Sequence, residues 1–64
     1  MEYNELKEGQ EIEFFWHFYS SNLFWKKGIV SVMEDGKYFF PRGMIMKIKI
    51  LPSDMVKVRK FQNS

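Results

Sequence analysis

The chain has 64 residues, which is enough for one small domain and too few for two. It carries a formal net charge of +2, no cysteine and a single histidine. These counts exclude disulfides and cysteine-based zinc sites, and one histidine does not build a histidine-rich metal site. The core must therefore be held by packing. The aromatic content of 19% suits this, because each ring buries a large area.

The beginning of the sequence indicates neither secretion nor membrane insertion. Residues 1–5 are acidic and lack the basic start and apolar middle of a signal peptide. No segment approaches the length of a membrane-spanning helix. We expect a cytoplasmic protein that does not contact a membrane, with one domain over residues 1–64 and frayed ends at 1–5 and 62–64.

The first predicted strand covers residues 11–19, because its side chains alternate with a period of two. Residues 20–22 end it, and we place Phe24 and Trp25 in a loop that follows. Residues 29–33 are rich in β-branched side chains and predict the second strand. The first strand has two rows: Ile12, Phe14, Trp16 and Phe18 face inward, and Glu11, Glu13, Phe15, His17 and Tyr19 face outward.

The second half of the chain predicts three more strands. Asp35-Gly36 is typical of a hairpin turn that leads into a third strand at 38–40. After a turn at 41–43, residues 44–51 alternate clearly. Residues 52–55 predict a short 3-10 turn, and a last strand at 56–59 turns both valines inward. Five short strands favour a strongly bent barrel, because an open sheet of this size exposes both edges. In the fourth strand, one face is expected to hold Met44, Met46, Ile48 and Ile50.

The order of these elements resembles the Src-homology-3-like small barrels, in the wide sense that includes KOW and Tudor domains. The resemblance covers nearly the whole chain and implies an all-β, five-stranded barrel with a short 3-10 turn before the last strand. The aromatic-acidic motif of the peptide-binding signalling domains is missing. For function, the resemblance implies only a class, the binding of nucleic acid or of another protein. It is carried by the entry Leu6–Ile12, the segment Trp25–Val32, the hairpin Asp35–Lys37, and the turn Pro52–Asp54 before the strand Val56–Val58.

Charge is unevenly placed along the chain. Residues 1–13 hold one lysine against five glutamates, a balance of −4, and residues 26–64 hold nine basic against three acidic residues, a balance of +6. One interpretation of this asymmetry is a basic surface that binds nucleic acid or an acidic partner. The other is that an acidic first strand pairs with a basic last strand and the two neutralise each other.

Aromatic residues gather in two neighbouring runs, at 14–19 and 23–25. Outward rings beside lysines stack on bases, form protein hot spots, or cover a seam between identical subunits. Met33, Ile45 and Leu51 are also expected to face outward, which favours a protein contact. The predicted partner-binding aromatic patch consists of Phe15, His17, Tyr19, Phe24 and Trp25.

Basic residues form the second candidate surface. Lys47 and Lys49 point the same way on a strand, and so do Lys57 and Arg59. Two such rows on neighbouring strands form a stripe that follows a phosphate backbone. The alternative is that these side chains only keep an outer strand soluble. The full predicted basic surface is Lys26, Lys27, Arg42, Lys47, Lys49, Lys57, Arg59 and Lys60.

Catalysis is not expected. His17 is the only obvious general base, and no Ser, Cys or Asp is arranged with it as a triad. Glu34 and Asp35 are adjacent and point apart, so they are poor paired carboxylates. The sequence has neither a phosphate-binding glycine loop nor metal-ligand spacing. We expect no enzyme activity, no cofactor, no metal and no small-molecule substrate.

The sequence thus predicts a binding module, foremost a small regulator that occupies a surface of a larger protein. Alanine and threonine are absent, a bias typical of AT-rich coding sequences in low-GC bacteria and their phages, so a phage-type regulator of a host protein is one form of this hypothesis. The alternative is a nucleic-acid-binding barrel that uses a basic strand face and stacking rings. A homo-oligomer whose outward rings form the subunit seam is the third hypothesis.

Overall fold

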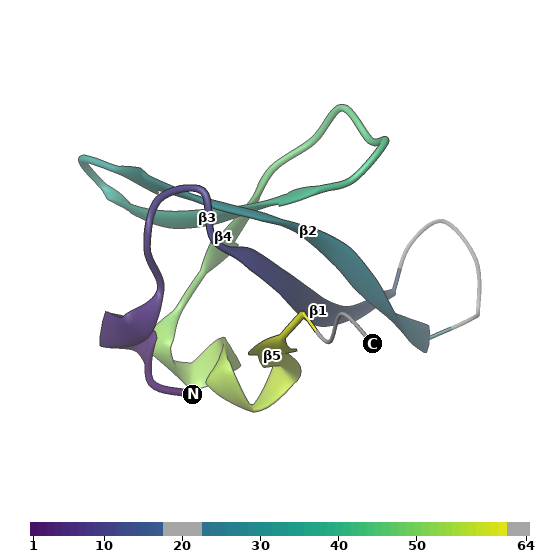
Figure 1. Cartoon of the computed structure of the whole chain (residues 1–64), viewed down its shortest axis with the longest axis horizontal. Coiled ribbons are helices and arrows are strands. Elements are labelled where there is room, and N and C mark those ends of the chain that lie inside the picture. Colours follow the sequence, from purple (N-terminus) through teal and green to yellow (C-terminus); the bar gives the residue numbers. More distant parts are fainter. Residues whose placement is uncertain (18–22, 62–64) are drawn as a thin grey trace.

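The computed structural model describes residues 1–17 and 23–61, and it leaves out the side chains at 16, 17, 23 and 24. The predicted strand end at 18–19 and the predicted fraying at 62–64 therefore lie outside the described residues. In the described part, all five strands join one antiparallel sheet in the order β4-β3-β2-β1-β5 (Figure 1). The strands are β1 (Glu11–His17), β2 (Leu23–Met33), β3 (Gly36–Pro41), β4 (Ile48–Ile50) and β5 (Val58–Lys60).

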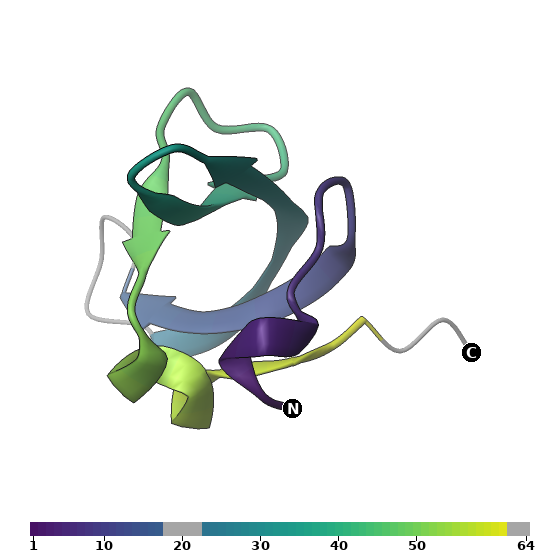
Figure 2. The same cartoon turned by 90° about the vertical axis from the view of Figure 1, so that its left-hand side faces the viewer.

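The sheet is strongly bent but not closed. Figure 2 shows it curling into an incomplete ring, with the two short 3-10 helices, η1 (Tyr3–Glu5) and η2 (Pro52–Lys57), beside its open part. No pairing joins β4 to β5 among the described residues. The all-β prediction and the short 3-10 turn before the last strand are confirmed, whereas the structure shows a bent sheet in place of a closed barrel.

Neither described helix has the length or hydropathy to cross a membrane.

The core lies on the inner face of this bend. Period-two alternation brings Ile12 and Phe14 from β1 together with Val30 from β2 and Phe39 from β3. The Phe14 and Phe39 rings lie 5.3 Å apart between centroids, in a tilted arrangement that aromatic pairs favour. Burial of these rings and of the other core side chains favours folding, because it removes apolar area from water. The buried hydrophobic residues are Leu6, Ile12, Phe14, Val30, Phe39, Ile50 and Val58.

Gly28 allows the bend at the centre of β2. It pairs with Ile12 on one side and Pro41 on the other. A Cβ atom at this position would collide with the Phe40 carbonyl oxygen and would lie 2.7 Å from the Phe39 ring. Because glycine has no side chain, β3 approaches β2 closely and the Phe39 ring lies against the Gly28 backbone.

Strand β2 begins earlier than predicted. It starts at Leu23, so the prediction of a loop around Phe24 and Trp25 is wrong. The added residues continue the ladder with β1, where Trp25 pairs with Phe15 and Leu23 pairs with His17. The sequence Lys26-Lys27-Gly28 suggested a break, but a paired partner strand overrides the weak local preference of these residues.

Strand β4 is shorter than predicted, because only Ile48–Ile50 of the expected 44–51 strand pairs with β3. Continuing the ladder would require Pro41, which has no N–H to donate. The predicted alternation of burial nevertheless holds along the segment: Met44, Met46 and Ile48 are partly buried, Ile50 is buried, and Ile45 is fully exposed.

Two further expectations at the ends of the chain differ from the structure. Val56 lies in η2 and is 85% exposed, so the prediction that both valines face inward is wrong; only Val58 is buried. At the start of η2, the Leu51 N–H donates to the Asp54 carboxylate at 2.8 Å. Residues 1–5, which we expected to fray, include η1, and Lys37 Nζ donates to the Tyr3 carbonyl oxygen at 2.8 Å.

Gly28→Ala is expected to lower the free energy of unfolding by about 2 kcal/mol, because the new methyl group must separate β2 from β3 or displace the Phe39 ring. Urea denaturation measures this change. Gly43→Asn is the matched control: Gly43 has a φ of +76° with nothing within 4 Å of an added Cβ, and asparagine tolerates that conformation. Equal stability of Gly28→Ala and the parent would refute the close approach.

Candidate interaction surface

The outer face of the sheet carries an aromatic pair. Phe15 in β1 and Trp25 in β2 are cross-strand partners, so both side chains leave the sheet on the face opposite Phe14 and the core. Their ring centroids lie 5.3 Å apart at an interplanar angle of 51°. Both residues are half-buried, so part of each ring remains open to solvent.

Arg59 lies on this aromatic pair. Its guanidinium carbon is 4.0 Å from the centroid of the Trp25 ring, within cation–π range. Its Nε donates to the Glu13 carboxylate at 2.8 Å. The Glu13 side chain is only 10% exposed, whereas the Arg59 side chain is 50% exposed. The register explains the contact, because Glu13 is the cross-strand partner of Arg59 in β5 and of Lys27 in β2.

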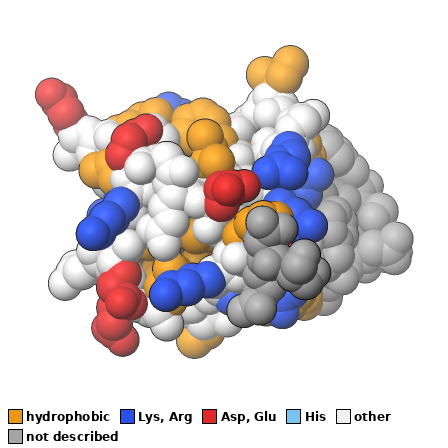
Figure 3. Space-filling model, in the orientation of Figure 1, with side chains coloured by type: hydrophobic (Ala, Val, Ile, Leu, Met, Phe, Trp, Pro, Cys, Tyr) orange, Lys and Arg blue, Asp and Glu red, His pale blue; other side chains and the backbone are white. Residues whose placement is uncertain are grey.

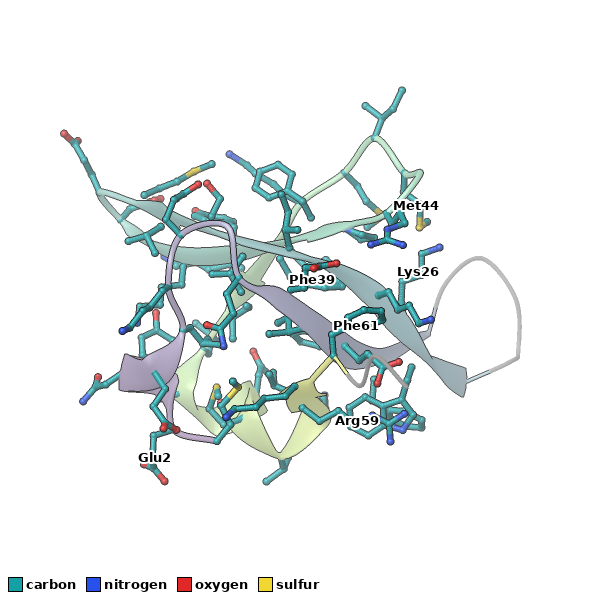
Figure 4. All side chains as sticks on the ribbon, in the orientation of Figure 1. Glu2, Lys26, Phe39, Met44, Arg59 and Phe61 are labelled. Carbon is teal, nitrogen blue, oxygen red and sulfur yellow. The ribbon has the colours of Figure 1, made fainter. Side chains whose placement is uncertain are left out.

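A second cation–π contact extends this surface. Lys27 Nζ lies 4.8 Å from the centroid of the Phe61 ring, just after β5. In Figure 4, Arg59 and Phe61 lie toward the end of the sheet where β1 and β2 meet. Figure 3 shows basic side chains gathered beside apolar ones at this end of the molecule. We call this surface the aromatic–basic face, and define it as Glu13, Phe15, Trp25, Lys27, Arg59 and Phe61.

The strands that carry this face extend beyond the body of the sheet. β3 pairs with β2 from Gly28 onward, and the Arg42 N–H also donates to the Lys27 carbonyl oxygen. Residues 23–26 have no partner on that side within the described chain. Residues 15–17 of β1 likewise lie outside its pairing with β5. The ends of β1 and β2 thus form a two-stranded arm with both outer edges unpaired (Figure 1).

The structure brings together part of the predicted aromatic patch. Phe15 and Trp25 meet on the outer face. His17 and Phe24 lie in β1 and β2, but their side chains are outside the described part, as is the whole of Tyr19. Phe24 pairs with Trp16, and this pair follows the pair of Phe15 and Trp25 along the ladder between β1 and β2.

The predicted basic residues do not form one stripe on neighbouring strands. β4 and β5 lie at opposite ends of the strand order and do not pair, so Lys49 and Arg59 are not on neighbouring strands. Lys57 belongs to η2 and does not follow the alternation of a strand, and Lys47 precedes β4. Arg42 pairs with Glu11 at 3.1 Å. Lys26 and Lys27 lie in β2, and Lys60 is on the face of β5 opposite Arg59.

Sequence reasoning missed Glu13 and Phe61 as members of the face. Glu13 occupies an outward position, yet it is buried because Arg59 and its aromatic neighbours cover it. The charge asymmetry contained the relevant signal. The ion pair between Glu13 and Arg59 shows neutralisation of the first strand by the last at one position, whereas Glu11 pairs with Arg42.

A separate polar cluster lies on the outer face of β3. The Tyr38 hydroxyl donates to the Asp35 carboxylate at 2.8 Å, and Lys47 Nζ lies 4.8 Å from the Tyr38 ring centroid. The hydrogen bond from Tyr38 is the main cause that holds the pKa of Asp35 below its usual value. The same bond raises the pKa of Tyr38, because the hydroxyl must lose the shared proton to ionise. This one hydrogen bond therefore shifts the pKa values of both Asp35 and Tyr38.

Exposed apolar side chains are spread over several parts of the surface. Met33, Ile45 and Leu51 are exposed, as the sequence predicted, and Ile29, Val32 and Val56 join them. An open apolar groove follows the loop after β3, lined by Phe40, Met44, Ile45, Met46 and Lys47. Among the described residues, no group of three or more His, Cys, Asp or Glu side chains has the arrangement of a metal site.

The comparisons with protein-family models, curated proteins and solved structures found no match to this chain.

Arg59→Met is expected to lower the free energy of unfolding by about 1–3 kcal/mol, because it leaves the nearly buried Glu13 carboxylate without its hydrogen-bond donor. Glu13→Gln in the same chain should recover part of this loss, since an uncharged amide is cheaper to bury. Urea denaturation of the two single variants and the double variant gives the coupling energy. Strictly additive effects would show that the ion pair does not contribute.

Tyr38→Phe is expected to raise the pKa of Asp35 toward its usual value, because the hydroxyl donor is lost. Carboxyl-carbon NMR titration measures the change, and Tyr3→Phe is a control at a tyrosine distant from Asp35 in the chain. Since the folded-state pKa of Asp35 is depressed, the bond stabilises the fold above the unfolded-state pKa. This stabilisation disappears as the pH falls through the folded-state value. An unchanged titration in Tyr38→Phe would contradict the assignment.

Proposed function

We propose that this protein is a binding module that acts without catalysis and contacts a larger protein through its aromatic–basic face. The observation that carries the proposal is the partly exposed stack of Phe15, Trp25 and Arg59. Tryptophan and arginine dominate the energetics of protein interfaces, where large rigid groups bury much area at low entropic cost. A regulator that occupies a surface of its partner is the form of function that this face supports best.

The arm formed by the ends of β1 and β2 supports the same proposal. Its unpaired edges lie beside the stack, so a partner contacts rings and backbone groups together. Isolated two-stranded ribbons are only marginally stable in water. A partner that covers the arm therefore gains contact area and also removes an exposed edge.

We propose in addition that the fold is a Src-homology-3-like small barrel, in which the two edge strands approach each other without pairing. The strand order β4-β3-β2-β1-β5, the bend at Gly28 and the 3-10 helix before β5 support it.

Nucleic-acid binding is the second candidate, favoured by the contact of Lys27 with the Phe61 ring and of Arg59 with the Trp25 ring. It ranks lower because the predicted basic residues are divided among β2, β4, η2 and β5, and β4 does not pair with β5. A continuous positive path along a phosphate backbone needs unpaired charges in a row.

Trp25→Ala and Phe15→Ala are expected to abolish capture of a partner protein by the tagged chain, because each removes half of the ring pair. Affinity purification from a low-GC bacterial lysate, with and without nuclease, measures this. Met33→Ala is the matched control, an exposed apolar residue at the opposite end of β2. Thermal melting checks that each variant is folded. Capture that survives both aromatic substitutions would refute the proposal, as would nuclease-sensitive, salt-sensitive recovery of nucleic acid alone.

A further inference from the structure

Resting on the proposed function, we infer that Arg59 is the anchor that binds an acidic side chain of the partner protein. Its guanidinium is held in place from two directions, by the Trp25 ring at 4.0 Å and by the Glu13 carboxylate at 2.8 Å. An arginine fixed in this way loses little conformational entropy when it binds a ligand.

The contacts of Arg59 leave most of its donors available. Only Nε is used by Glu13, and no described residue accepts a hydrogen bond from the two terminal Nη groups. The Arg59 side chain as a whole is 50% exposed. The pair of Nη groups matches the two oxygens of a carboxylate, which binds such a fork with two parallel hydrogen bonds.

The charge of the aromatic–basic face favours an acidic ligand. Glu13 is its only acidic residue, and Arg59 already neutralises that carboxylate. Lys27 flanks Glu13 on the other strand, contacts the Phe61 ring, and forms no ion pair with a described carboxylate. The face thus keeps one excess positive charge among half-exposed rings, which complements an acidic residue that has apolar neighbours.

A carboxylate of a protein fits this face better than a chain of phosphates. One guanidinium and one ammonium lie among rings here, whereas Lys26 and Lys60 occupy the alternate positions of β2 and β5, and Lys49 lies on β4. A single acidic side chain needs one fork and an apolar surround, whereas a nucleic-acid strand needs repeated phosphate contacts. The specificity of the module therefore arises from Arg59, and the aromatic pair supplies the contact area.

Selection of a displayed library of random twelve-residue peptides against the full chain tests this inference. Enriched peptides are expected to contain Asp or Glu beside an apolar residue. Replacing that acidic residue by its amide should weaken binding about tenfold or more, the loss expected for a charge-assisted hydrogen-bond pair. The same peptides should lose affinity for Arg59→Lys, which keeps the charge and loses the planar fork.

Two variants keep the test independent of folding. Arg59→Gln combined with Glu13→Gln removes the guanidinium without leaving a buried unpaired charge, and thermal melting establishes that it is folded. Lys49→Met is the matched control, a lysine removed from the opposite edge of the sheet. The inference predicts loss of peptide binding in the double variant and unchanged binding in Lys49→Met.

The outcomes separate this inference from the proposed function. Enriched peptides that need Trp25, carry no acidic residue and still bind the double variant would overturn the role of Arg59 and leave the protein-binding proposal standing. Failure to enrich any Trp25-dependent peptide would overturn both. Displacement of acidic peptides by oligothymidylate at equal concentration would overturn the choice of a protein carboxylate over a phosphate chain.

Discussion

The bent sheet depends on the contact between the Gly28 backbone and the Phe39 ring. With no side chain at Gly28, β3 lies close to β2, and Phe39 reaches Phe14 across the inner face. A flat sheet of this length would leave its inner residues only half covered, and a chain of 64 residues has no second layer to cover them. Curvature thus replaces the missing layer, and the two helices fill part of the remaining opening.

The same curvature explains why the outer face holds the candidate site. Side chains on the convex side of a bent sheet have more room than those on the concave side, so large groups there stay partly exposed unless they cover one another. Phe15, Trp25 and Arg59 cover one another only in part, and Arg59 pairs with the nearly buried Glu13. The ion pair between Glu13 and Arg59 thus lies within an aromatic surface, and the pairing of β1 with β2 and β5 fixes its position.

Local alternation allowed much of the fold to be predicted, because the sides of β1 and the burial pattern of residues 44–50 follow directly from a period of two. Strand lengths could not be predicted as well from the local sequence. The start of β2 is determined by its pairing with β1, and the start of β4 by Pro41 in the neighbouring strand. For the site, alternation correctly placed Phe15 outward, but the position of Arg59 over Trp25 depends on pairing between β1 and β5, which no local pattern encodes.

The position of β1 between β2 and β5 has a consequence for the growing polypeptide. Strand β1 cannot complete its pairing until β5 is available, since Arg59 follows Glu13 by 46 residues and every other strand lies between them. While a ribosome still holds β5, the hairpins of β1, β2 and β3 are free to form, but the Glu13 carboxylate has no cation from β5 beside it. Such long-range closure is slow compared with local hairpin formation. The aromatic–basic face is therefore the last part of the domain to mature.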